Sequence, residues 1–144
     1  MLPRRIRVIT IAIIRRADEI LVFEGYDHVK GETFYRPLGG GIEFGEPSIE
    51  ALRREFREEI NTELTDLHYL TTLENIFTVY DQPGHEFIVI YAAEFADPVL
   101  YEKEIIVGFE DNGDRFKALW MPLNDFRAGM YPLYPTGLLE LLEE

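Results

Sequence analysis

The sequence predicts a single α+β domain spanning residues 1–144. Its length suits one compact domain, and 47% of its residues are hydrophobic, which is enough to build a core. Most of these apolar residues fall in short segments rich in β-branched and aromatic side chains, as expected for strands. One strongly amphipathic helical pattern interrupts them. No internal repeat, low-complexity tract or linker divides the chain, so one mixed α+β unit is the simplest architecture.

The elements follow from alternating or continuous apolar runs and from the turn residues between them. In chain order, strands are expected at residues 4–16, 20–25, 34–38, 67–80, 86–96, 105–109 and 116–121. The first two should form a hairpin around the polar break at 17–19. The glycine run 39–41 should interrupt regular structure, and 81–84 should form the turn between the two long strands. Short helices are expected from Pro122 and over 135–142.

Residues 47–60 carry the clearest helical pattern. Apolar residues recur at spacings of three and four along one face, namely Ile49, Leu52, Phe56 and Ile60. Pro47 suits the first helical position, and the acids Glu46 and Glu50 favour the positive N-terminal end. Asn61 is suited to end the helix in a left-handed conformation.

The charge balance excludes some partners. The chain has 27 Asp and Glu against 14 Lys and Arg, a formal net charge of −13. Long nucleic acids and acidic membrane surfaces are therefore unexpected partners, because both need cationic surfaces. Residues 43–66 carry −5 and 94–114 carry −6, whereas the arginines of 1–16 give +5. Solvated, solubilising surface is the ordinary explanation for such acid. The basic segment is open to two interpretations, a contact in a homodimer or a contact with substrate phosphates.

The N-terminus resembles a secretion signal only in part. Arginines precede the apolar run 8–14, but Arg15 and the acids after it occupy the place of a cleavage site. No stretch approaches the roughly 20 apolar residues of a membrane span. The absence of cysteine removes disulfides and thiolate chemistry, and a cytoplasmic location is expected.

Three carboxylates lie close together on the predicted helix. At about 100° per residue, Glu59 lies about 40° to one side of Glu55 and Glu58 about 60° to the other. The three border the apolar stripe, whereas a simple solvated face would lie opposite it. Carboxylates that converge in this way repel one another unless a cation neutralises them. An all-oxygen ligand set favours Mg²⁺ or Mn²⁺.

These acids belong to a longer pattern that resembles the Nudix box, G-x5-E-x7-R-E-U-x-E-E-x-G-U, where U is apolar. Six fixed residue types match at fixed spacing in the run Gly40-x5-Glu46-x7-Arg54-Glu55-Phe56-x-Glu58-Glu59. Two positions after it depart from the box, because Asn61 replaces a glycine and Thr62 replaces an apolar residue. Neither departure falls on a metal-ligand position.

The resemblance implies the Nudix α/β/α sandwich, a mixed β-sheet flanked by helices, and a set of site residues. The catalytic set would be Glu55, Glu58, Glu59 and Arg54, with the three glutamates as ligands of Mg²⁺ or Mn²⁺ and Glu55 also as a base for water. The Gly39 carbonyl and an acid from a later loop would add metal ligands. Spacing favours Asp114 for this acid, with Glu110 as the second choice. Gly40 and Glu46 would be structural, with Glu46 and Arg54 joining loop to helix.

Four residues are candidates for contacts with the substrate, three of them in or beside the glycine run. The candidates are Arg36, Gly40, Gly41 and Asn124. Arg36 is suited to pair with a phosphate, although an exposed arginine at a strand end is an equal alternative. For Asn124, an N-cap is favoured over a contact with a base edge. Core packing is favoured individually for Tyr26, Phe34, Phe44 and Phe87, although one aromatic near the site is expected to cover the nucleobase.

The resemblance thus implies a Mg²⁺- or Mn²⁺-dependent Nudix pyrophosphohydrolase that acts on a small nucleotide. The favoured substrate is a nucleoside triphosphate, normal or oxidised, cleaved to monophosphate and pyrophosphate. The alternatives are ADP-ribose or another sugar nucleotide, and a dinucleoside polyphosphate. A non-catalytic nucleotide-binding Nudix module is the alternative from a different class of protein.

Overall fold

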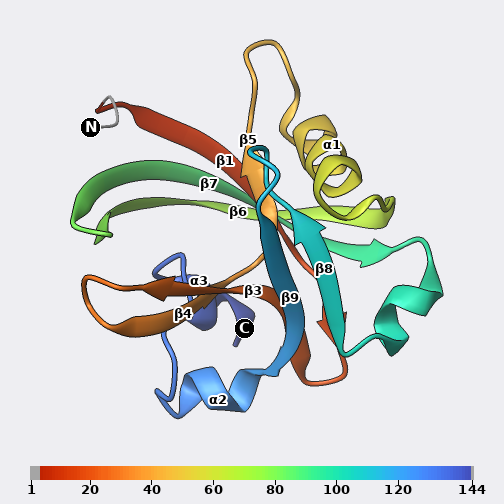
Figure 1. Cartoon of the computed structure of the whole chain (residues 1–144). Coiled ribbons are helices and arrows are strands. Elements are labelled where there is room, and N and C mark those ends of the chain that lie inside the picture. Colours follow the sequence, from red (N-terminus) through yellow and green to blue (C-terminus); the bar gives the residue numbers. More distant parts are fainter. Residues whose placement is uncertain (1–3, 144) are drawn as a thin grey trace.

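The computed structural model describes residues 4–143, which form two β-sheets with helices on either side (Figure 1). The first sheet has the strand order β5-β1-β7-β6, formed by Gly39–Gly41, Ile6–Ile13, Gln82–Phe95 and Leu64–Val79. It is mixed, because β1 runs parallel to β7 and antiparallel to β5. The second sheet contains β2 (Arg15–Arg16), β3 (Glu19–Asp27), β4 (Glu32–Arg36), β8 (Ile105–Phe109) and β9 (Arg115–Pro122).

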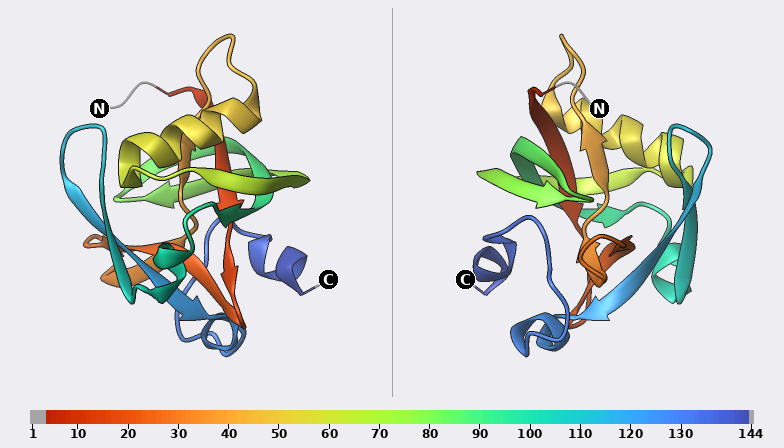
Figure 2. Two further views of the ribbon diagram at one scale, coloured as in Figure 1. Left: turned by 90° about the vertical axis from the view of Figure 1, so that its right-hand side faces the viewer. Right: turned by 60° about the vertical axis from the view of Figure 1, so that its left-hand side comes forward.

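The helices lie on opposite sides of the sheets (Figure 2). The long helix α1 (Ser48–Ile60) lies on one side, and the short helices α2 (Leu123–Arg127) and α3 (Leu138–Leu142) lie on the other. A 3-10 segment, η1 (Pro98–Glu102), connects β7 to β8. The expected Nudix sandwich of helices around sheets is therefore confirmed. No helix in residues 4–143 is long and apolar enough to cross a membrane.

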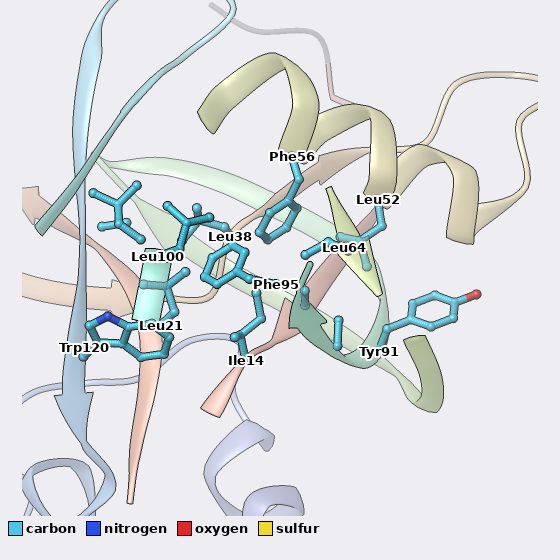
Figure 3. Packing of buried hydrophobic residues seen from close by; sticks show 14 residues of the cluster. Ile14, Leu21, Leu38, Leu52, Phe56, Leu64, Tyr91, Phe95, Leu100 and Trp120 are labelled. Atoms are coloured by element: carbon cyan, nitrogen blue, oxygen red, sulfur yellow. The ribbon is translucent and has the colours of Figure 1, made fainter. Parts of the chain in front are cut away.

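Each helical layer covers its own hydrophobic cluster. Leu52 and Phe56 of α1 are fully buried against residues of both sheets, among them Phe95 and Trp120 (Figure 3). Ile49 and Ile60 pack at the margin of the same cluster, so the predicted apolar stripe is confirmed. On the other side, the apolar residues of α2 and α3 pack on the alternate residues of β1 and β7. The period of two in a strand places the residues of β1 into both clusters in turn.

The predicted strand 4–16 is divided between the sheets at Ile14. Its first part, β1, pairs with β5 and β7, and only Arg15–Arg16 form the predicted hairpin with β3. The glycine run that was expected to break regular structure is instead strand β5. It lies at the open edge of the first sheet, where a strand needs only one neighbour.

The turn of the long hairpin also differs from the prediction. It lies at Tyr80-Asp81, where both residues have positive φ, and β7 continues through Pro83 and Gly84. Two left-handed residues give the turn twist that a two-residue hairpin requires. Gly84 is not part of the turn. It leaves room for the ring of Phe77, which would lie 2.4 Å from a Cβ at this position.

Helix boundaries shift by a few residues. Pro47 is the N-cap of α1 and not its first helical residue, whereas Asn61 ends α1 with φ 51° and ψ 48°, as predicted. Pro122 likewise precedes α2 as its N-cap. The helix expected at 135–142 begins only at Leu138, because Gly137 has a left-handed backbone with φ 96°.

Candidate metal and nucleotide site

Strand β5 lies against the acidic residues of α1, and glycine is required for this approach. A Cβ at Gly40 would lie 2.4 Å from the carboxyl carbon of Glu55. A Cβ at Gly39 would lie 1.9 Å from the backbone oxygen of Thr10 on β1. The two glycines therefore allow the strand to fit between β1 and the Glu55 side chain. Glu55 is only 7% exposed as a result.

Main-chain groups of β5 also face the site. Ala12 donates its N–H to the carbonyl of Leu38, and Ile42 donates to that of Val8. In an antiparallel pair these groups alternate sides, so the main-chain groups of Gly39 and Gly41 face away from β1. The Gly41 carbonyl accepts a hydrogen bond from Arg54 Nη2 at 2.9 Å. The Gly39 carbonyl faces the same way, as the prediction that it binds a metal requires.

Arg54 connects the glycine strand, the following loop and the acids of α1. It forms a two-pronged pair with Glu46, from Nε at 2.8 Å and from Nη2 at 2.9 Å. Its Nη1 donates to Glu55 at 3.0 Å and to Glu58 at 3.3 Å. The bonds to Glu46 raise the pKa of Arg54, and the same contact lowers the pKa of Glu46, so both stay charged. This pair fixes the loop before α1 and orients two of its carboxylates.

An acidic cluster forms where α1 meets the loop between β8 and β9. Ligand atoms of Glu55, Glu58 and Asp111 all lie within 4.8 Å of one another. Figure 1 shows the β8–β9 loop reaching to the level of β5 and α1. Asp111 belongs to this loop. Burial, followed by the hydrogen bond and charge of Glu55, raises the pKa of Glu59 to about 9. Asp111 and Glu110 add to this effect.

The later-loop acid of this cluster is Asp111 and not Asp114. Asp114 is exposed, and its side chain accepts a hydrogen bond from Asn112 at 3.0 Å within the loop. Two backbone hydrogen bonds close the turn from Glu110 to Asp114: the Glu110 N–H donates to the Asp114 carbonyl, and the Gly113 N–H donates to the Glu110 carbonyl. Asp114 therefore lies at the base of the turn. Asp111 lies inside the turn, and its carboxylate is close to those of α1. The sequence offers several acids here, but spacing alone does not reveal this turn.

The donor set fits a hard divalent cation. The carboxylates of Glu55, Glu58 and Asp111 converge from α1 and the β8–β9 loop, and that of Glu59 is adjacent. The Gly39 carbonyl on β5 faces away from β1. Oxygen-only ligation suits Mg²⁺ or Mn²⁺.

The pKa of Glu59 leads to a prediction for the metal-free protein. Unfolded Glu59 ionises near 4.5 and folded Glu59 near 9. Between these values the folded state binds more protons, so the free energy of unfolding falls as the pH rises. We expect Glu59→Gln to have a higher metal-free Tm than wild type near pH 8 and an equal Tm near pH 4. Thermal melts in a metal chelator test this, and a lower Tm of the variant at pH 8 would contradict it.

A cavity of about 430 Å³ lies between the β3–β4 and β6–β7 hairpins. Its aromatic lining consists of Phe23, Phe34, Phe77, Tyr80 and Tyr134. Phe34, for which the sequence favoured core packing, thus also lines a cavity. Sequence reasoning missed Phe23, Phe77 and Tyr134. Strand alternation does not say which face of β3 or β6 lines a cavity, and Tyr134 lies outside the strands. Glu110 lines the cavity too and is the neighbour of Asp111, so the cavity adjoins the acidic cluster.

Two charged side chains give the cavity a polar wall. Arg36 lies 3.7 Å from Glu86, which is only 5% exposed. Burial lowers the pKa of Arg36, and Glu86 partly offsets this. Asp27 also lines the cavity and ties the two hairpins together, since it accepts the N–H of Tyr80 at 3.2 Å. Burial alone would raise the pKa of Asp27, but backbone N–H groups, with Tyr80 first, lower it overall.

Asn124 does not join the other candidates. It lies on α2, at the opposite end of the molecule from α1 (Figure 1), and its Oδ1 accepts a hydrogen bond from Arg127. It is not the N-cap either, because Pro122 occupies that position. The remaining substrate candidates, Arg36, Gly40 and Gly41, lie at the cavity or on β5.

Comparison with known proteins agrees with the fold. The family model described as NUDIX domain matches residues 3–140. A MutT NUDIX hydrolase from Burkholderia pseudomallei is 23% identical with a TM-score of 0.65, over 97% of this chain and 98% of that one. A NUDIX hydrolase from Nitrosomonas europaea is 18% identical with a TM-score of 0.63, over 96% and 87%. A structure described as an ADP compounds hydrolase is 17% identical with a TM-score of 0.62, over 95% and 71%.

The chain belongs to the Nudix hydrolase family. It is accordingly an enzyme of the class that acts on phosphorus-containing anhydrides. At these identities the solved structures establish its fold, and they do not distinguish one substrate from another.

Proposed function

We propose that this protein is a Mg²⁺- or Mn²⁺-dependent pyrophosphohydrolase of small nucleotides, with a nucleoside triphosphate as the favoured substrate. The observation that carries the proposal is the junction of the acidic cluster with the aromatic cavity. Asp111 belongs to the cluster, and its neighbour Glu110 lines the cavity. A nucleotide has this same polarity, with an aromatic base at one end and a phosphate chain at the other.

The cavity suits the nucleoside end of such a substrate. About 430 Å³ is within the usual range of small-molecule pockets. Aromatic side chains stack on any base, so the lining favours nucleobases as a class. The Arg36–Glu86 pair adds hydrogen-bond donors and acceptors in a poorly solvated wall, where they discriminate between polar groups.

The acidic cluster suits the phosphate end. A bound divalent cation would neutralise phosphate charge and acidify the attacking water. Glu55, Glu58, Glu59, Asp111 and the Gly39 carbonyl are the proposed ligands. Glu55 is also the proposed base, because it is buried and held by Arg54 and so keeps one orientation. Phosphoryl transfer needs positioning and charge neutralisation more than a protein nucleophile, and the site contains no such nucleophile among these residues.

The Nudix pairing of Glu46 with Arg54 is proposed to be structural. Arg54 holds two of the acids and the Gly41 carbonyl at once, so it prevents the loop before α1 from moving relative to the cluster. Its catalytic contribution is therefore proposed to be indirect, through the position of Glu55 and Glu58.

A substrate panel tests the function. Nucleoside triphosphates, their oxidised forms, ADP-ribose and dinucleoside polyphosphates are incubated with Mg²⁺ or Mn²⁺, and products are identified by ion-exchange chromatography. We expect metal-dependent turnover, with a triphosphate giving monophosphate and pyrophosphate. If ADP-ribose or a dinucleoside polyphosphate is turned over faster, that compound replaces the triphosphate as the favoured substrate. An ADP compounds hydrolase is among the similar structures. Binding without turnover of any compound would support the non-catalytic module instead.

Three further predictions stay open. The single domain over 1–144 is proposed from the length and from the family match over 3–140. A cytoplasmic location is proposed from the cysteine-free composition. A homodimer is proposed only as one use of the basic N-terminal segment, and gel filtration with light scattering would decide it.

A further inference from the structure

We propose that Arg7 on β1 binds the substrate phosphate that lies between the aromatic cavity and the acidic cluster. This site rests on the proposed function and extends it, because neither the box nor the cavity lining includes Arg7. The inference follows from three features: the partner of Arg7, its position beside β5, and the charge around it.

Arg7 shares a buried partner with the cavity wall. Its Nη1 donates to Glu86 Oε2 at 3.3 Å, while Arg36 lies 3.7 Å from the other oxygen, Oε1. The Glu86 side chain is only 7% exposed, whereas that of Arg7 is 52% exposed. One buried carboxylate thus orients two guanidiniums, and the group carries a formal net charge of +1. Arg7 offers the more accessible donors of this group.

Arg7 also lies beside the glycine strand. A Cβ built on Gly41 would lie 3.6 Å from Arg7 Nη2, so this guanidinium is next to the Gly41 backbone. The Gly41 carbonyl in turn accepts from Arg54, which holds Glu55. Arg7 therefore lies between Glu86 of the cavity wall and Gly41, whose carbonyl is bound to the arginine that orients the acidic cluster. Since β5 is the edge strand of its sheet, no further strand within residues 4–143 lies beyond Gly41 to separate Arg7 from the acidic cluster.

The charge of the surroundings favours such a cation. The other charged groups placed around the cluster are mostly acidic, and the cations among them, Arg54 above all, are engaged in short bonds to glutamates. A nucleotide carries several negative charges, and part of its phosphate chain must extend from the metal site toward the base. A guanidinium binds phosphate oxygens with charge-assisted and often paired hydrogen bonds. Arg7 provides this on the path between the two sites.

The test compares Arg7→Gln with Arg5→Gln, an exposed arginine two residues earlier, and with Arg7→Lys. For the best nucleotide of the panel, we expect Arg7→Gln to raise KM by about 10–100-fold with kcat changed by less than about threefold, and Arg7→Lys to restore part of the loss. Competition measurements separate the phosphate from the base. The inhibition constant of inorganic pyrophosphate should rise in Arg7→Gln, whereas that of the unphosphorylated nucleoside should not.

The alternative is that Arg7 only stabilises the Glu86 region. In that case Arg7→Gln would weaken the nucleoside and the nucleotide equally, or would lower Tm without changing KM, and either result overturns the proposal. An equal KM rise in Arg5→Gln would also overturn it, because it would indicate general attraction and not a site. A wild-type protein that neither binds nor hydrolyses any nucleotide overturns the proposed function and this inference together. Wild-type turnover with an unchanged KM in Arg7→Gln overturns this inference alone.

Discussion

Glu58→Gln is expected to lower metal-dependent hydrolysis by about 10²–10³-fold and to leave the fold intact. The substitution keeps the shape of the side chain and removes one charged ligand from the cluster with Glu55 and Asp111. Charge stabilisation by a bound metal contributes several kcal/mol to the transition state, which corresponds to a rate loss of this size. The Glu58 side chain is about half exposed, so its replacement disturbs no packing.

Glu50→Gln is the matched control for this experiment. Glu50 lies on the same helix, its side chain is 50% exposed against 49% for Glu58, and its partner is Arg53 outside the cluster. Initial rates of the two variants over a range of Mg²⁺ concentrations should separate by at least about 10²-fold. Similar rates in Glu50→Gln and Glu58→Gln would show that the box acids do not form the catalytic site.

Gly40→Ala is expected to weaken metal binding far more than it weakens the fold. The new Cβ would lie 2.4 Å from the carboxyl carbon of Glu55, so one of the two must move. The end of a glutamate side chain yields more easily than a strand that is paired with β1. We therefore expect Glu55 to leave its place against Arg54, with a loss of about 10–100-fold in Mn²⁺ affinity and a comparable loss of rate.

Gly41→Ala serves as the comparison for metal affinity. Its Cβ would meet only Arg7 Nη2, at an ordinary 3.6 Å, and would not touch the acids of α1. Calorimetric titration with Mn²⁺ should give a nearly wild-type affinity for this variant and a reduced one for Gly40→Ala. If Gly40→Ala kept wild-type affinity, the close approach of β5 to Glu55 would not position the ligand.

The sequence determined the α1 side of the site more fully than the rest. The apolar stripe, the clustered acids and the box spacing all lie within about 20 consecutive residues, where helical periodicity fixes which side chains share a face. The left-handed Asn61 shows that a departure from the box at this turn preserves its geometry. Local geometry of this kind is encoded locally, and so it was predictable.

What sequence reasoning missed depends on contacts between distant segments. Asp111 joins α1 from a loop about 50 residues later, and the internal bonds of that loop decide that it does so in place of Asp114. The glycine run forms a strand because β1 pairs with it and Glu55 needs the room, and neither fact is visible in three glycines. The cavity lining likewise depends on how two hairpins face each other. The position of Asn124 relative to α1 depends on the same packing (Figure 1).

The central claim is that Glu55, Glu58 and Asp111 form one divalent metal site. The most direct test is to titrate wild type, Asp111→Asn and Asp114→Asn with Mn²⁺ and to measure binding by isothermal titration calorimetry. Both aspartates are exposed and belong to the same short loop, but only Asp111 lies in the cluster. We expect Asp111→Asn to weaken Mn²⁺ binding by about tenfold or more and Asp114→Asn to match wild type. Wild-type affinity in Asp111→Asn, or the loss in Asp114→Asn instead, would contradict this metal site.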